Sequence, residues 1–93
     1  MLIGALSVDI HIPEAHSLKD KRRVIQSLIE TTRRKFNVSI SEIDNQDLWQ
    51  LATLGIVCVS NDGRFVNKAL DNVLDMLEAN GDIQIGQTVL EIL

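Results

Sequence analysis

Aromatic side chains are scarce in this 93-residue chain, which contains no tyrosine, one tryptophan and two phenylalanines. Proteins that read single-stranded RNA on a β-sheet stack the bases on aromatic residues of the strands. Here Trp49 is the only aromatic residue expected on a strand, because Phe36 and Phe65 fall at predicted helix positions. The sequence also lacks a Gly-x-x-Gly clamp. Base stacking on the sheet is therefore excluded, and any contact with RNA is expected to involve its backbone and shape.

Cysteines and long apolar runs are equally limited. The single cysteine cannot form an internal disulfide, which is typical of a protein in a reducing cytoplasm. No apolar run reaches the ~18 residues that a membrane span needs. The first residues have neither a basic segment nor a following cleavage site of small residues, so we expect no signal peptide. We therefore expect a cytoplasmic protein with no membrane partner, folded as one domain over residues 1–93.

Groups suited to catalysis or metal binding are also few. Cys58 lies in an apolar stretch and is expected to be buried and inert. The spacing of Gly81 and Gly86 is that of a phosphate-binding loop, yet Gln87 stands where lysine is required. Four residues near the end of the first predicted strand make a poor zinc ligand set, with two histidines and no second cysteine: Asp9, His11, Glu14 and His16. We therefore expect no metal, no cofactor, no small-molecule substrate and no enzymatic activity.

Six secondary-structure elements follow from the periodicity of the apolar residues. Strict alternation predicts a strand over 2–12, and Ser17 is a candidate N-cap for a helix over about 18–35. Strands are predicted over 38–44, 48–60 and 82–93, with a turn at 45–47 and a second helix after residues 61–63. The order βαββαβ favours an α+β, ferredoxin-like fold: a four-stranded antiparallel sheet with two helices on one face.

Such a fold leaves the other face of its sheet without cover. If Leu6, Val8 and Ile10 point toward the helices, their neighbours along the first strand point away. An uncovered apolar patch is typical of a surface that binds a partner, either another protein or a second copy of the chain. The residues that we expect at this interface are Ile3, Trp49, Leu51, Val57 and Val59.

The positive charges are concentrated in the first predicted helix. Residues 1–36 hold seven of the nine basic side chains but four of the thirteen acidic ones, while the whole chain has a net charge of −4. Cations in the first two turns oppose the helix dipole, and together with free backbone N–H groups they could bind an anion such as RNA phosphate. The candidate RNA-binding residues are Lys19, Lys21, Arg22, Arg23, Arg33 and Arg34.

A simpler interpretation of the same helix is a solvated charged surface. Glu30 could pair with Arg33 and Arg34 three and four residues further along. Cations in the last turn are also favourable at the negative end of the helix dipole. Charge alone separates a binding surface from a solvated face poorly, so both interpretations stay open.

Several segments resemble the YlxP-like family, also called domain of unknown function 503. They are Ser-Leu-Lys-Asp-Lys-Arg-Arg-Val-Ile at 17–25, Phe-Asn-Val-Ser at 36–39, Glu42, and Asp-Leu-Trp-Gln at 47–50. The resemblance implies a ferredoxin-like fold in a bacterial cytoplasmic protein. Genes of this family are often found beside genes for transcription elongation, translation initiation and ribosome maturation. The family has no established enzymatic residues, and the cations from Lys19 to Arg23 match its motif.

Two hypotheses result from these observations. The first is a non-enzymatic protein of ribosome assembly or translation that contacts ribosomal RNA, or a ribosomal subunit, through the basic first helix. The alternative is a protein-interaction module or homodimer that uses the open face of the sheet and has no contact with nucleic acid.

Overall fold

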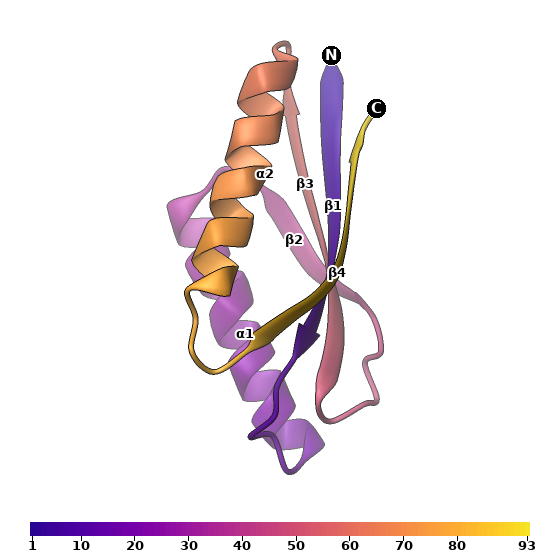
Figure 1. Cartoon of the computed structure of the whole chain (residues 1–93), viewed down its shortest axis with the longest axis vertical. Coiled ribbons are helices and arrows are strands. Elements are labelled where there is room, and N and C mark those ends of the chain that lie inside the picture. Colours follow the sequence, from indigo (N-terminus) through magenta and orange to yellow (C-terminus); the bar gives the residue numbers. More distant parts are fainter.

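The computed structural model describes residues 1–93 and contains the six expected elements in the expected order (Figure 1). The strands are β1 (Leu2–His11), β2 (Ser39–Asp44), β3 (Leu51–Ser60) and β4 (Gln84–Ile92). The helices are α1 (Leu18–Lys35) and α2 (Gly63–Glu78). The molecule is elongated, with principal extents of 42 × 21 × 17 Å.

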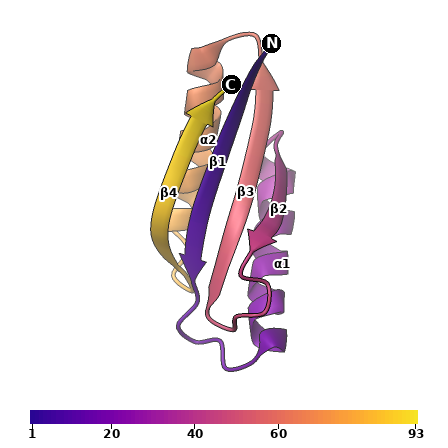
Figure 2. The same cartoon turned by 90° about the vertical axis from the view of Figure 1, so that its right-hand side faces the viewer.

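The strands form one antiparallel sheet in the order β2-β3-β1-β4. Figure 2 views the sheet from its open side, with both helices behind it and both chain termini at the same end. Each helix connects two strands that are not neighbours, which is the arrangement of the ferredoxin-like fold. The fold predicted from the sequence is therefore confirmed.

Capping residues define where both helices begin. The Ser17 hydroxyl accepts a hydrogen bond from the Asp20 backbone N–H at 3.0 Å, which confirms Ser17 as the N-cap of α1. The Asp20 carboxylate in turn accepts from the His16 backbone N–H at 3.2 Å. In a capping box it would accept from the N–H of the N-cap itself, Ser17. Asp62 caps α2 by accepting from the Arg64 N–H at 3.0 Å.

The core lies between the sheet and the two helices. Alternate residues of β1 and β3 face the helices, as the sequence predicts, and the α2 stripe packs on them with Val66, Leu70, Val73 and Leu77 fully buried. The strand residues of this core are Leu6, Val8, Ile10, Ile40, Ala52, Leu54, Ile56 and Cys58. The alternating pattern thus places the opposite set of side chains on the open face.

The start of β3 differs from the prediction. Residues 48–50 do not extend the strand, which begins at Leu51 rather than Leu48. Asn45 adopts a positive φ of 62°, which asparagine tolerates, and redirects the chain after β2. The Gln50 side chain donates to the carbonyls of Pro13 and Ala15 at 3.1 and 3.0 Å, so it fastens this segment to the loop between β1 and α1. Trp49 consequently lies in the β2–β3 loop and not on the sheet.

A bulge occurs in β4 where the sequence places Gly86. The register changes from Val8 opposite Thr88 to Ile10 opposite Ile85, so β4 has one extra residue. A Cβ atom at Gly86 would lie 3.2 Å from the Cβ of Asp9, which is tighter than an ordinary contact. The glycine therefore permits the close approach of the two strands at the bulge.

Neither helix has the combined length and apolar character that crossing a membrane would require.

Helix α2 approaches the sheet closely at Gly4. A Cβ atom there would collide with Val66 Cγ1 and approach Leu70 Cδ1 to 2.8 Å. We predict that Gly4→Ala destabilises the protein by about 1–3 kcal/mol, because α2 must shift away from β1. Urea unfolding followed by circular dichroism measures this change.

Gly81→Ala is the matched control, since nothing lies within 4 Å of a Cβ atom at that position. Its free energy of unfolding should stay within about 0.5 kcal/mol of the parent protein. Equal stability of the Gly4→Ala variant and the parent would contradict the tight packing of α2 on β1.

Candidate nucleic-acid interface

Five of the six candidate RNA-binding cations are exposed along α1. We call these residues, Lys19, Arg22, Arg23, Arg33 and Arg34, the basic face. Lys35 follows them in the last turn and is also exposed. None of these side chains is within ion-pair distance of a carboxylate, because the two ion pairs of the protein involve Lys21 and Arg64. Their charges are therefore not neutralised by the protein itself.

The pairing of Glu30 with Arg33 and Arg34 that the spacing allows does not form. Arg33 Nη2 donates instead to the carbonyl oxygen of Ile40 at 3.2 Å, and Arg34 Nη2 makes a long 3.5 Å contact with Thr31 Oγ1. Arg33 is therefore partly engaged by the start of β2, whereas Lys19, Arg22 and Arg23 make no side-chain hydrogen bond or ion pair. The first two turns hold the most available positive charge.

Lys21 is not part of this surface, which corrects the sequence-based assignment. Its side chain is 0 % exposed and lies on the buried stripe of α1 with Ile25, Leu28 and Thr32. This stripe has the spacing i, i+4, i+7 and i+11, so helical periodicity could have identified Lys21 as buried. A side chain without solvent contact cannot bind an RNA phosphate, and Lys21 is removed from the candidates.

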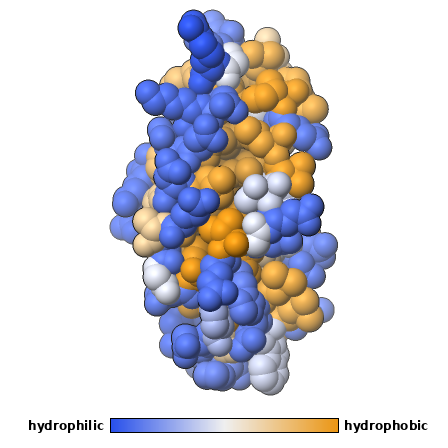
Figure 3. Space-filling model, viewed as in Figure 1, coloured by the Kyte–Doolittle hydropathy of each residue, from blue (hydrophilic) through white to orange (hydrophobic).

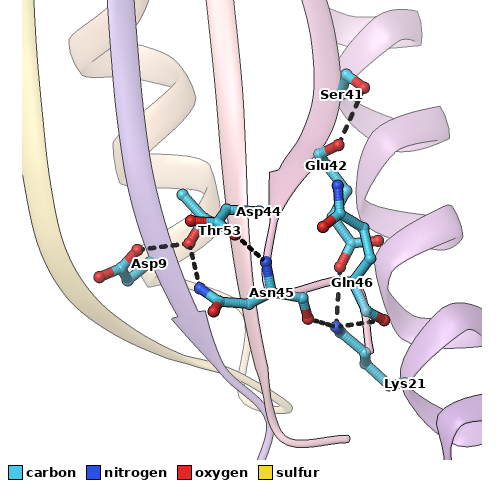
Figure 4. Close-up of polar contacts among 8 residues, drawn as sticks. All are labelled: Asp9, Lys21, Ser41, Glu42, Asp44, Asn45, Gln46 and Thr53. Atoms are coloured by element: carbon cyan, nitrogen blue, oxygen red, sulfur yellow. Dashed lines mark hydrogen bonds and ion pairs between the residues drawn. The ribbon is translucent and has the colours of Figure 1, made fainter. Parts of the chain in front are cut away.

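The ammonium group of Lys21 is surrounded by oxygen atoms of β2 and the β2–β3 loop (Figure 4). It donates to the carbonyl oxygens of Asn45 at 2.6 Å and Gln46 at 3.3 Å. Glu42 Oε2 lies 2.9 Å away at an ion-pair distance, although the direction of approach is not that of a hydrogen bond. A buried charge needs such partners, because an unpaired ammonium in the interior would be strongly unfavourable.

The same polar network continues across the sheet through Asn45 and Thr53 (Figure 4). Asn45 Nδ2 donates to Thr53 Oγ1 at 2.9 Å, and Thr53 Oγ1 donates to Asp9 Oδ1 at 2.8 Å. The backbone N–H of Asn45 also donates to Asp44 Oδ1 at 2.8 Å. The network connects α1, the β2–β3 loop, β3 and β1, so it holds the loop in one position against both layers.

The other chemical groups considered in the sequence are not brought together. His11 Nδ1 is 3.2 Å from Gln84 Oε1, and no group of three or more His, Cys, Asp and Glu side chains is placed to hold a metal ion. Cys58 is buried, and this burial raises the pKa of its thiol, while a hydrogen bond with the Gly4 backbone acts in the opposite direction. The thiol is therefore held in its neutral form at ordinary pH, in which it is a poor nucleophile.

The open face of the sheet carries part of the predicted interface. Val57 and Val59 are 38 % and 59 % exposed, while Ile3 and Leu51 are only partly accessible. Trp49 is 56 % exposed but projects from the loop. Figure 3 shows hydrophobic side chains gathered at the upper right, over the strand ends near the two termini, whereas the helical side is mainly hydrophilic.

A shallow hollow of about 440 Å³ lies on this open face, and we call it the sheet hollow. Small residues at Ala5, Ser7 and Gly55 form its floor, and Val57 and Val89 line it. Ile43 sits at a bulge in β2, and its side chain lies against Gly55, where an added Cβ atom would be 3.0 Å from Ile43 Cγ2. The hollow is mostly apolar and could accept an apolar side chain of a partner.

A second cavity, of about 390 Å³, was not anticipated from the sequence, and we call it the helix pocket. It lies between the end of α1 and the first half of α2, and its walls include Phe36, Phe65, Lys35 and Lys68. The remaining lining residues are Asn37, Val38, Cys58, Val59, Ala69 and Asn72. The spacing of Phe65, Lys68, Ala69 and Asn72 is that of one helical stripe, which is the sequence signal that could have revealed it.

The fold and these surfaces define a small ferredoxin-like protein with an exposed basic helix and an open sheet face. The chain belongs to the DUF503 family, described as "Protein of unknown function", whose sequence profile matches residues 3–89. It is 39 % identical over 83 residues to the "Uncharacterized protein YlxP" of Bacillus subtilis (strain 168). That match covers 89 % of this chain and 90 % of the relative. The resemblance inferred from the sequence motifs is confirmed.

We predict that Lys21→Met destabilises the fold by about 2–4 kcal/mol, because Glu42 and two loop carbonyls lose their cationic partner. Chemical unfolding monitored by circular dichroism measures the change. Adding Glu42→Met to this variant should recover part of the loss, since the unpaired carboxylate is then removed as well.

Arg22→Met is the control, because it removes a neighbouring but exposed cation of the same helix. Its free energy of unfolding should change by no more than about 0.5 kcal/mol. A Lys21→Met variant as stable as Arg22→Met would show that the buried ammonium group does not hold α1 to β2 and the β2–β3 loop.

Proposed function

We propose that this protein is a non-enzymatic RNA-binding protein whose basic face contacts the phosphate backbone. The observation that supports it best is the absence of intramolecular ion pairs at Lys19, Arg22 and Arg23. Arginine is well suited to phosphate, because its planar guanidinium can donate two parallel hydrogen bonds.

The distribution of charge also favours a local contact. The chain as a whole has a net charge of −4, so a large anionic partner is repelled by most of the surface and attracted by α1. The cations of the first two turns stand beside the N-terminal backbone N–H groups of the helix, and both favour an anion. The proposed binding mode is therefore a single helix laid against an RNA backbone, which reads shape rather than base sequence.

Ribosomal RNA is the proposed partner. The family resemblance implies genes encoded beside those of ribosome maturation and translation, and a cytoplasmic protein in that context meets folded ribosomal RNA. The choice of ribosomal RNA depends on this gene neighbourhood, whereas the contact with phosphate depends on the charges of α1.

We predict that the protein binds ribosomal RNA with an affinity that falls steeply as salt increases. Replacing Lys19, Arg22 and Arg23 together by glutamine should lower the affinity by at least about 10-fold. It should also reduce the slope of log K against log salt by roughly 2–3, about one for each cation that no longer neutralises a phosphate. Fluorescence anisotropy of labelled ribosomal RNA fragments, titrated at several salt concentrations, measures both quantities.

Arg64→Gln is the control, since Arg64 is an exposed cation on α2 with a 97 % accessible side chain, outside the basic face. Its affinity and salt slope should match those of the parent protein. An unchanged affinity and slope in the triple variant would exclude the basic face as the RNA-binding surface.

A second candidate function is self-association through the open face of the sheet. Four strands about 4.8 Å apart, up to ten residues long at about 3.3 Å each, form a face of roughly 15–20 by 30 Å. This is of the order of the ~800 Å² that each partner contributes to a standard interface. The half of the face nearest the chain termini is mainly apolar, so a second copy could pack on it. The residues there are Ile3, Val57, Val59, Val89 and Leu93, with Glu91 beside them.

For this candidate we predict a dimer in sedimentation velocity at micromolar concentration. Val57→Lys should shift the protein to a monomer, because two buried ammonium groups would face each other near the centre of the interface. Asn67→Lys adds the same charge at an exposed position of α2 and should leave the dimer intact. A parent protein that sediments as a monomer up to 100 μM, a concentration of the order of 10⁻⁴ M, would exclude self-association.

A further inference from the structure

The helix pocket brings together the aromatic side chains that the sequence separates. Phe36 follows the last turn of α1, and Phe65 lies in the first turn of α2, yet both line the same cavity. Phe36 is partly buried against the core, whereas Phe65 is 61 % exposed. An exposed phenylalanine at the mouth of a cavity offers a ring face on which a planar group can stack.

The polar groups of the pocket match an anionic, planar ligand. Lys35 and Lys68 stand on the two helices, and no carboxylate is among the lining residues. The pocket is therefore positively charged, although the chain has thirteen acidic and only nine basic residues. The side-chain amides of Asn37 and Asn72 can both donate and accept hydrogen bonds, as the edge of a nucleobase requires.

The size and position of the pocket agree with that chemistry. A volume of about 390 Å³ lies within the ~300–1,000 Å³ range of small-molecule sites. Lys35 is in the last turn of α1 and, unlike the residues of the basic face, lines the pocket, so this helix places a positive charge at the pocket as well. An RNA strand that passes the C-terminal end of α1 could therefore place one of its nucleotides in the pocket.

We infer that the helix pocket binds one unpaired nucleotide of RNA. The base stacks on Phe65 and Phe36, and Lys35 and Lys68 hold the adjacent phosphates. This inference rests on the proposed RNA-binding function and deepens it: the protein prefers RNA with an unpaired nucleotide over a continuous duplex. The aromatic platform is in the helical layer, which is why the lack of aromatic residues on the sheet does not exclude base stacking.

The test compares two labelled RNAs of equal length, one fully paired and one with a single-stranded loop, by fluorescence anisotropy. Phe65→Leu should weaken binding of the looped RNA by about 5- to 100-fold, the range expected for the loss of a stacked base, and leave duplex binding unchanged. Lys68→Gln should also act mainly on the looped RNA. The controls are Trp49→Leu, which removes an aromatic ring of similar exposure in the β2–β3 loop, and Arg64→Gln.

Circular dichroism of Phe65→Leu establishes that the fold is intact, as expected for an exposed side chain.

The outcomes separate this inference from the function on which it rests. Equally weakened binding of both RNAs in the triple variant of the basic face, with no selective effect of Phe65→Leu, would overturn the pocket and retain the basic face. Salt-insensitive or undetectable binding of both RNAs would overturn both proposals. Binding of free AMP to the pocket without preference for looped RNA would overturn the assignment to RNA.

Discussion

A buried ammonium group is the constraint on which the arrangement of the two layers depends. Lys21 is on the inner side of α1, and its charge is compensated by Glu42 of β2 and by the carbonyl oxygens of Asn45 and Gln46. Because an unpaired charge in the interior is so unfavourable, α1 and the β2–β3 loop must meet in one relative position. Asn45 also connects the loop to the sheet: its side chain donates to Thr53 of β3, which in turn donates to Asp9 of β1.

This constraint also shapes the surface that the proposed function uses. Burial of Lys21 rotates Lys19, Arg22 and Arg23 to the outer side of α1, where no carboxylate of the protein reaches them. The Glu42 carboxylate of β2 is already paired with Lys21. The positive charge of these three residues is thus available to a partner, because neither Asp20 nor Glu30 of the same helix forms an ion pair with them.

Much of the fold could be predicted because its signals are local. Alternation along β1, the Ser17 cap and the α2 stripe each depend on residues within a few positions of one another. The start of β3 was misplaced because Leu48 and Trp49 have strand-forming side chains, while the bend depends on Asn45 and on Gln50 contacting the loop after β1. Strand propensity is readily overridden by such tertiary contacts.

The sequence by itself determined the family, the six elements, their order and the inward-facing residues, because periodicity, caps and turn residues are properties of neighbouring positions. Tertiary structure decided which cations are exposed and which aromatic rings share a cavity. Lys21 and Arg22 are adjacent in the chain, yet one is buried and the other solvated. Phe36 and Phe65 meet only because α1 and α2 cover the same side of the sheet. The helical stripe indicates that Lys21 faces inward, but the oxygen atoms that compensate its charge, like the two walls of the pocket, come from segments distant in the chain, and local patterns do not specify such partners.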